Sequence, residues 1–181
     1  MFKKGVPFPF ASHLINLGHK VQIIHIDDFQ NPKIIRYASE DQVDNYFNRS
    51  WNLSQLVDEL LAPIHSGRSI SCSLMLLDIA ADEFIAEREY KIEQDTIVLL
   101  EGVFLFRQEL ANFIDYKVFI CVSFEEARRR IIQRDSCDIV QKIDTKYHPT
   151  QKKYLQEYSP EDLADMVIDN TDWNEPIILK T

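Results

Sequence analysis

Short, continuous runs of β-branched and other apolar residues recur along the chain, separated by stretches with helical spacing. Three of these runs predict strands, namely "KVQIIHID" (20–27), "TIVLLEG" (96–102) and "YKVFICVS" (116–123). A run that is apolar at nearly every position is typical of a parallel strand covered on both faces. A last short strand is expected at 166–169, within "ADMVIDNT".

Helices are predicted between these strands. In "WNLSQLVDELLAPIHSG" the apolar residues recur at helical intervals, and Pro63 and Gly67 close the helix. Shorter or more polar helices are expected over 10–18, 107–114, 124–135 and the stretch that begins at Thr150. The segment 70–93 stays ambiguous, because "SLMLLDI" and "EFIAEREYKI" could pair as a hairpin but the turn residues between them are weak.

The alternation of strands and helices predicts an α/β fold, with a parallel sheet that carries helices on both faces. The chain has 181 residues, 45% of them hydrophobic, which suits a single domain spanning 1–181. No internal repeat and no Ser/Gly-rich linker divides it.

Charge and composition narrow the function classes. The net charge of −9 argues against sequence-independent binding of nucleic acid, which depends on a basic surface. No apolar run reaches the roughly 18 residues of a membrane span, so no membrane partner is expected. The three cysteines form no CxxC pair, and with no secretory signal they favour a reducing, cytoplasmic location.

Acidic residues stand at the ends of two expected strands. The strand 20–27 ends in Asp27 and Asp28, and the strand beginning at Thr96 ends in Glu101 and Gly102. In open α/β sheets ligands bind at the carboxyl ends of strands, where two carboxylates can share a magnesium ion and a hydroxyl proton. The alternative is that Asp27 and Asp28 only cap the turn that follows.

The helix "FEEARRRIIQRD" offers a third candidate. Arg130 and Arg134 are four residues apart, so they share one helix face and could clamp phosphate oxygens. The alternative is a solvated helix whose arginines pair internally with Glu125 and Glu126.

Other residue types give weaker signals. His25 lies inside a strand, where a core role is favoured, and no HExxH pattern indicates a zinc site. Phe47 and Trp51 are interpreted as core residues rather than as a stacking platform.

Four segments in this order resemble the uridine kinase and phosphoribulokinase family of P-loop kinases. They are "VQIIHIDDFQNPK", "DTIVLLEGVFLF", "DYKVFICVSFEEARRRIIQRD" and "KYHPTQKKYLQEYSPEDLADMVIDNTDWNEPII", which together cover roughly half of the chain. The resemblance implies an ATP-dependent transfer of phosphate to a hydroxyl of a nucleoside or other small molecule. ATP and Mg²⁺ are the implied cofactors, and a homo-oligomer is left open.

The resemblance also implies roles for single residues. Asp27 matches the acid that accepts the proton of the substrate hydroxyl, and Glu101 matches the acid near magnesium. Arg130 and Arg134 match arginines of a lid, at about 125–150, that closes over the phosphates.

The resemblance also implies residues that bind the nucleotide and the phosphate acceptor. Asp169 and Asn170 would lie at the strand end near the adenine. Asp28, beside the base, and Asp78, in the counterpart of the family's substrate hairpin, would contact the acceptor. Gln30 stands where an aromatic residue is usual in the family.

The family's phosphate-binding loop, GxxxxGK[ST], is absent from the 181 residues. "MFKKGVPFPFA" occupies its place, and Pro7 and Pro9 cannot donate backbone N–H bonds to a phosphate. The central strand that precedes this loop is also missing, so strands 96–100 and 116–122 would flank an empty slot. Residues 1–10 could fill the slot, the flanking strands could pair directly, or an upstream segment could complete the natural protein; the third is our preferred hypothesis.

Two functional interpretations follow. The first is a uridine kinase-like phosphotransferase in which the binding of ATP and Mg²⁺ is weakened or lost. The second is a non-catalytic kinase remnant that acts as a binding or regulatory module.

Overall fold

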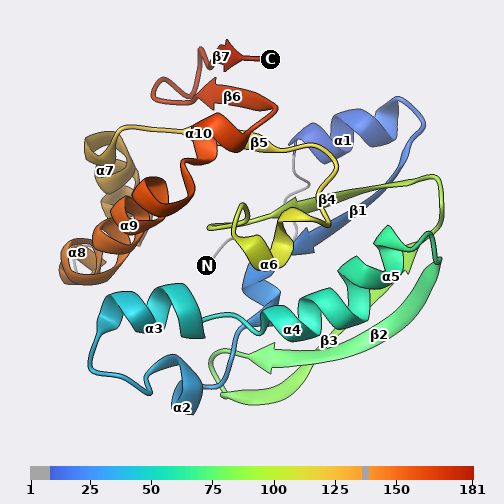
Figure 1. Cartoon of the computed structure of the whole chain (residues 1–181), viewed down its shortest axis with the longest axis horizontal. Coiled ribbons are helices and arrows are strands. Elements are labelled where there is room, and N and C mark those ends of the chain that lie inside the picture. The colour runs from blue at the N-terminus through green and yellow to red at the C-terminus, as the bar shows by residue number, and fades with distance from the viewer. Residues whose placement is uncertain (1–8, 136–138) are drawn as a thin grey trace. The chain divides into compact units, whose positions relative to one another are not determined.

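The computed structural model describes residues 9–135 and 139–181, and these fall into two compact units. The first unit comprises the described residues up to Lys33 together with Trp51–Val103, and the second comprises Ile34–Ser50 and Phe104–Thr181. Figure 1 labels their helices and strands. The expectation that 1–10 could fill a slot in the sheet falls mostly outside the described residues.

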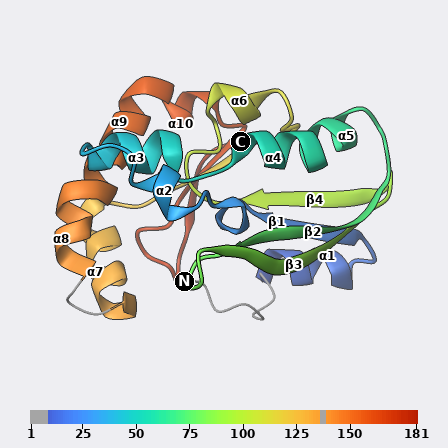
Figure 2. The same cartoon turned by 90° about the horizontal axis from the view of Figure 1, so that it is seen from below.

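The first unit is built on two parallel strands and an antiparallel hairpin. Its elements are α1 (Pro9–Asn16), β1 (Lys20–His25), the 3₁₀ turn η1 (Ile26–Phe29), α4 (Leu53–Leu56), the π-helical turn η2 (Val57–Leu61), α5 (Ala62–His65), β2 (Ile70–Asp78), β3 (Glu83–Ile92) and β4 (Thr96–Glu101). β1 pairs with β4 in parallel register from Lys20–Thr96 to His25–Glu101. Figure 2 shows α1 and α4 on opposite sides of this pair.

The ambiguous segment 70–93 is an antiparallel hairpin of β2 and β3. Its tight connection depends on Asp78, whose Oδ1 accepts hydrogen bonds from the backbone N–H groups of Ala80 and Ala81 at 2.9 and 3.0 Å. This local side-chain bond provides the turn chemistry that the sequence pattern did not make evident.

The core of the first unit forms between these elements. Its buried apolar side chains come from the end of β1, the helical segment 53–61 and one face of the hairpin: Ile24, Ile26, Phe29, Leu56, Leu60, Leu61, Leu74, Leu76, Leu77, Tyr90 and Ile92. The leucines spaced at helical intervals in 53–61 therefore pack as the sequence pattern predicts.

The second unit holds a three-stranded sheet and most of the polar helices. Its elements are α2 (Lys33–Arg36, which begins at the last residue of the first unit), α3 (Gln42–Arg49), α6 (Gln108–Ala111), β5 (Val118–Cys121), α7 (Phe124–Asp135), α8 (Val140–Lys142), the π-helical turn η4 (Ile143–Tyr147), α9 (His148–Tyr158), α10 (Pro160–Leu163), β6 (Met166–Asp169) and β7 (Ile177–Lys180). β5 pairs with β6 in parallel, and β6 pairs with β7 in antiparallel orientation.

An aromatic cluster forms the core of this second unit. The Phe104 ring lies 5.3 Å from that of Phe47 and 5.2 Å from that of Tyr154. The buried Arg107 places its guanidinium 4.8 Å from the centre of the Phe47 ring and donates to the Phe47 carbonyl at 2.9 Å. The predicted core role of Phe47 is therefore observed, and the buried cation is satisfied by a ring, a carbonyl and the carboxylate of Glu109, which lies 2.9 Å from Arg107 Nη2.

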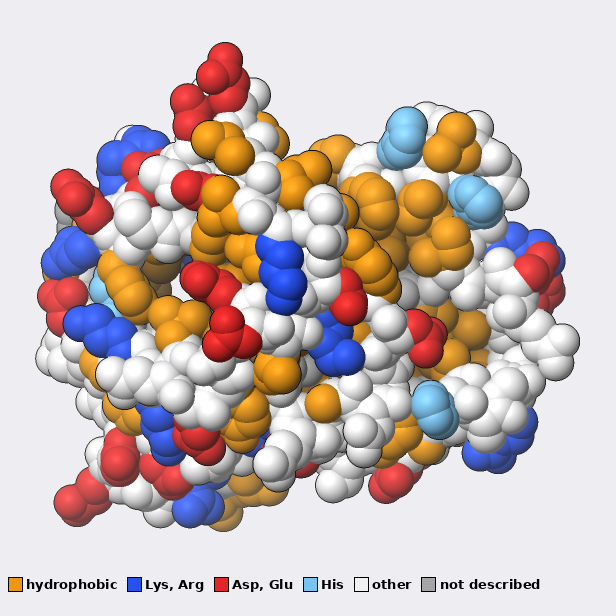
Figure 3. Space-filling model, turned by 45° about the horizontal axis from the view of Figure 1, so that its top comes forward, with side chains coloured by type: hydrophobic (Ala, Val, Ile, Leu, Met, Phe, Trp, Pro, Cys, Tyr) orange, Lys and Arg blue, Asp and Glu red, His pale blue; other side chains and the backbone are white. Residues whose placement is uncertain are grey.

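The strands expected to flank a missing central strand belong to different sheets. β4 pairs with β1, and β5 pairs with β6, in the part of the chain that the structure describes. Direct pairing of these two strands, one of the three sequence-based alternatives, is therefore not the arrangement found. One face of the β5–β6–β7 sheet keeps Val118, Ile120 and Ile178 at 42–57% exposure, and Figure 3 shows hydrophobic side chains reaching the surface on this side.

Gly102 follows β4 and packs directly against η1. Its φ of +147° is one that side-chain-bearing residues rarely adopt, and a Cβ there would lie 2.1 Å from Cγ2 of Ile26. The close approach of the two strand ends therefore requires glycine.

Replacing Gly102 with alanine should lower the free energy of unfolding by about 2–6 kcal/mol, from backbone strain plus overpacking. Gly67→Ala is the matched control, since Gly67 also has positive φ but no atom lies within 4 Å of the position that its Cβ would take. It should cost only about 1–2 kcal/mol. Urea unfolding measures both, and equal losses would contradict the close contact with Ile26.

Candidate active site

Two acidic strand ends lie together in the first unit. Glu101 is the last residue of β4 and the register partner of His25, and Asp27 follows His25 by two residues in η1. Because β1 and β4 run parallel, both carboxylates stand at the carboxyl end of the pair, as the sequence predicts.

Asp27 is an exposed carboxylate held by one neighbour. Trp51 Nε1 donates to Asp27 Oδ1 at 3.2 Å, while the Trp51 ring is buried. Trp51 is itself placed by an isolated bridge to Gln30, and the next residue, Asn52, donates its backbone N–H to Phe29 at 2.7 Å. Among the described residues, Asp27 Oδ2 has no hydrogen-bond partner, so it can accept a proton from a bound molecule.

Glu101 is paired with a histidine. His25 Nδ1 and Glu101 Oε1 are in hydrogen-bond contact across the β1–β4 pair, and both side chains are partly exposed. His25, which the sequence pattern placed in the core, is therefore a partner of Glu101, the carboxylate predicted to lie near magnesium. No group of three or more His, Cys, Asp or Glu side chains suited to a metal ion is found among the described residues.

The two predicted acceptor-binding aspartates have structural contacts of their own. Asp28 Oδ2 lies 3.6 Å from Arg88 Nε of β3. Burial raises the pKa of Asp28, and the charge of His25 opposes that rise. Asp78 caps the hairpin turn, so at least one of its oxygens is occupied by backbone N–H groups.

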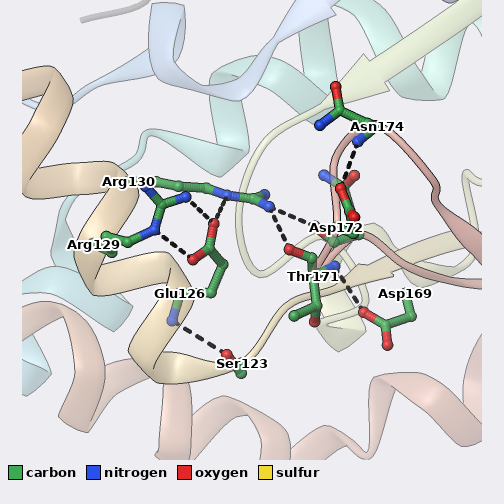
Figure 4. A network of polar contacts seen from close by, with 9 residues as sticks. Ser123, Glu126, Arg129, Arg130, Asp169, Thr171, Asp172 and Asn174 are labelled. Atoms are coloured by element: carbon green, nitrogen blue, oxygen red, sulfur yellow. Dashed lines mark hydrogen bonds and ion pairs between the residues drawn. The ribbon is translucent and has the colours of Figure 1, made fainter.

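In the second unit, Glu126 organises the arginines of α7 (Figure 4). Arg129 donates to both oxygens of Glu126 at 2.7 and 2.6 Å, and Arg130 Nε donates to Oε1 at 2.6 Å. These hydrogen bonds from two guanidinium groups lower the pKa of Glu126 to about 2. The internal pairing considered as an alternative for this helix is therefore present for Glu126, with Arg129 and Arg130 as its partners.

Arg130 also reaches the loop that follows β6. Its Nη2 donates to the carbonyls of Asn170 and Thr171 at 2.8 and 2.9 Å, which Figure 4 shows. The structure thus brings together three of the residues predicted for phosphate and adenine binding: Arg130, Asp169 and Asn170. Arg134 lies in the last turn of α7 and is exposed.

Asp169 and Asn170 shape their own loop. Asp169 Oδ1 accepts a hydrogen bond from the backbone N–H of Thr171 at 2.8 Å. Hydrogen bonding by the Thr171 side chain, followed by that of its backbone N–H, lowers the pKa of Asp169. The backbone N–H of Asn170 donates to the carbonyl of Cys121 at the end of β5 at 2.9 Å. The loop is therefore fixed to the carboxyl end of the parallel β5–β6 pair.

Solved structures similar to this chain include three that match with probability 1.00. A protein from Bacillus stearothermophilus described as a possible uridine kinase has a TM-score of 0.64 at 20% identity, covering 88% of this chain and 77% of that one. A protein from Silicibacter assigned as a fructose transport system kinase has a TM-score of 0.62 at 14% identity, covering 82% and 76%. Phosphoribulokinase from Rhodobacter spheroides has a TM-score of 0.63 at 15% identity, covering 93% and 67%.

The chain has the fold of the uridine kinase and phosphoribulokinase family. The predicted α/β class and the resemblance to these P-loop kinases are confirmed at the level of the fold. No protein-family model matches the sequence, and no curated protein matches it either. None of the described helices is long and apolar enough to cross a membrane.

The sequence patterns did not predict two of the contacts at the end of the β1–β4 pair. Trp51 was interpreted only as core, although its indole N–H also orients Asp27. His25 was interpreted as core, although it faces Glu101. The contact between His25 and Glu101 could have been found from the sequence. Each is the sixth residue of its strand, so parallel pairing in register places them opposite each other.

The Glu126 carboxyl should titrate near pH 2 in the folded protein, against about 4.3 in an unfolded chain. Because the folded pKa is the lower one, this group stabilises the fold above about pH 4.3, and that contribution is lost as the pH falls toward 2. Carboxyl carbon shifts in an NMR titration measure it.

Replacing Arg129 and Arg130 together with methionine should raise the Glu126 pKa toward its ordinary value. Arg128→Met is the control, since Arg128 pairs with Asp144 instead, at 3.2 Å. A Glu126 pKa that stays low without Arg129 and Arg130 would contradict the assigned cause.

Proposed function

We propose that the protein is an ATP-dependent phosphotransferase acting on a hydroxyl of a small molecule. The observation that supports this most directly is the pair of carboxylates at one end of β1 and β4, Asp27 and Glu101, with Asp27 Oδ2 available. The kinase fold of the similar structures agrees with it. The names of those proteins suggest a nucleoside, a sugar or a sugar phosphate as acceptor.

Asp27 would act as the base. As the acceptor oxygen attacks the terminal phosphorus of ATP, its proton passes to Asp27 Oδ2, and the bond from that phosphorus to the bridging oxygen breaks to release ADP. Trp51 holds the other carboxylate oxygen, so the free one keeps a fixed direction. Such positioning is a large part of what a kinase contributes, since no covalent intermediate on the protein is needed.

Glu101 would help to hold Mg²⁺ when the nucleotide is bound. A single carboxylate is enough if phosphate oxygens and water complete the coordination, and the ion then neutralises charge on the phosphates. His25 occupies Oε1 of Glu101, and among the described residues Oε2 has no hydrogen-bond partner, so that oxygen is the one that would face the ion. In the second unit, Arg130 and Arg134 would contact phosphate, and Asp169 and Asn170 would contact the adenine.

Asp27→Asn should abolish transfer, lowering kcat by about 10²–10⁴-fold because asparagine cannot accept the proton. Affinity for Mg·ATP should change by less than about twofold. Coupled ADP-release assays with uridine, fructose and ribulose 5-phosphate as acceptors, followed by calorimetry with Mg·ATP, measure the two effects.

Asp95→Asn is the matched control. Asp95 is an exposed carboxylate just before β4, paired with Lys20 at 3.1 Å, so it lies at the other end of the same strand pair. Its loss should leave kcat unchanged. A variant Asp27→Asn that keeps wild-type transfer would refute the assignment of the base.

A second candidate function is a non-catalytic module with a kinase fold. It is favoured by the absence of GxxxxGK[ST] from the sequence and by the commitment of Arg130 to Glu126 and two carbonyls. Titration of the 181-residue chain with Mg·ATP separates the two. Micromolar binding supports the phosphotransferase, and no heat up to millimolar nucleotide supports the module.

A further inference from the structure

The first residue of α7 packs against two side chains of α9. The ring of Phe124 meets the ring of His148 edge-on, with the ring centres 4.9 Å apart, and Lys152 Nζ lies 5.6 Å from the centre of the Phe124 ring. His148 and Lys152 are four residues apart in α9, so they share one face of that helix. The start of α7 is therefore held by one imidazole ring and one ammonium group.

An ion pair makes a second contact one turn further along α7. Arg128, four residues after Phe124, donates from Nη2 to Asp144 Oδ2 at 3.2 Å. Asp144 belongs to η4, four residues before His148, and η4 leads directly into α9. Both contacts therefore lie on one face of α7 and join it to a single helical run, 143–158.

His148 has a buried nitrogen atom without a hydrogen bond. Its Nε2 is closed off from solvent and finds no partner among the residues that the structure describes. A neutral imidazole leaves one ring nitrogen without a proton, and that nitrogen can lie beside an apolar ring at modest cost. An imidazolium carries a proton on both nitrogens, so protonation would place a charged donor there without an acceptor.

The charges that face His148 leave this cost uncompensated. Lys152 of α9 and Arg128 of α7 are cations, and the carboxylate of Asp144 in η4 is already paired with Arg128. Burial is the first cause that lowers the pKa of His148; Asp144 opposes the fall, and the charges of Arg128 and Lys152 add to it.

α3 also packs against α9, further along that helix. The Phe47 ring lies 6.5 Å from that of Tyr154. The charged residues of α3 beside this contact, Asp44 and Arg49, pair with each other at 2.9 Å. The charge that α3 brings to α9 is therefore already balanced, and the response of His148 is set by α7 and η4.

We propose that His148 makes the packing of α7 sensitive to protons: α7 packs on the neutral imidazole and separates from the helical run 143–158 when the imidazole is protonated. The sign follows from the lowered pKa, because the separated state binds the proton more readily than the packed state. The packing is at full strength above the ordinary histidine pKa of about 6.5, and it weakens as the pH falls below that value.

Separation of α7 extends to the loop that follows β6. α7 also carries Arg130, whose Nη2 donates to the carbonyls of Asn170 and Thr171 at 2.8 and 2.9 Å. A loosened α7 holds these carbonyls less firmly, so the loop gains freedom at the same time. These contacts lie wholly in the second unit, and the response occurs whether or not the protein transfers phosphate.

Hydrogen exchange of the full chain, detected by NMR, tests this response. After correction for intrinsic exchange rates, the protection of α7 amides should fall by up to about fourfold from about pH 8 to about pH 6, the largest effect that one histidine can have over this range. The amides of β6 serve as the internal reference, because β6 stays paired with β5 when α7 separates. Protection of α7 that does not change with pH would overturn the proposal.

His148→Phe removes the titrating group and keeps an aromatic ring beside Phe124. The protection of α7 in this variant should be the same at both pH values. His19→Phe is the matched control, since His19 is exposed and lies just before β1 in the first unit. It should keep the wild-type response. A full pH response in His148→Phe would assign it to another group and refute the role of His148.

Ring-proton NMR of the unaltered chain gives a second readout that needs no variant at position 148. His148 should titrate at lower pH than an ordinary histidine, and a titration at or above about pH 6.5 would contradict the proposal. Arg128→Met leaves Asp144 without its arginine, so the carboxylate can pair with the imidazolium. This variant should move the His148 titration to higher pH and reduce the pH response of α7.

Discussion

The parallel pairing of β1 with β4 sets the position of nearly everything that could carry chemistry in the first unit. Its register places His25 opposite Glu101, and Gly102 lets the backbone beyond β4 approach Ile26. The turn that follows β1 then presents Asp27 to solvent, with Trp51 on one oxygen. A slip of one residue in this register would separate His25 from Glu101 and shift the turn that carries Asp27, so the ladder specifies how these groups meet.

In the second unit, the cationic side chains are held mainly by the carboxylates with which they pair. Glu126 holds Arg129 and Arg130, and Asp144 holds Arg128. Arg107, buried in the aromatic core, pairs with Glu109 at 2.9 Å. Lys146 differs from these, because rings rather than carboxylates surround it. The arginines named above are therefore paired with carboxylates, while Lys146 lies among aromatic rings.

Periodicity and residue type predicted the strands, the main helices and the acidic strand ends, because each depends on residues adjacent in sequence. The 3₁₀ turn at Ile26–Phe29 and the helices α2 and α3 lay beyond that reasoning, since no apolar run announces them. The residues that contact the predicted site residues could not be predicted from the sequence pattern either. Trp51 meets Asp27 across 24 positions, and Arg130 meets Asn170 across 40, so only the folded chain reveals that these groups are occupied.

The interleaved path of the chain through its two units has a consequence for how the protein reaches its native state. The backbone leaves the first unit after Lys33, returns at Trp51 and leaves again after Val103. His25 and Glu101 are 76 residues apart, so the first parallel ladder cannot close during synthesis until most of that unit has emerged from the ribosome. Contacts this distant in sequence slow folding. Neither unit corresponds to a continuous stretch that could be cut out: a single proteolytic cut after Lys33 would divide the first unit, one after Val103 would divide the second, and one after Ser50 would divide both.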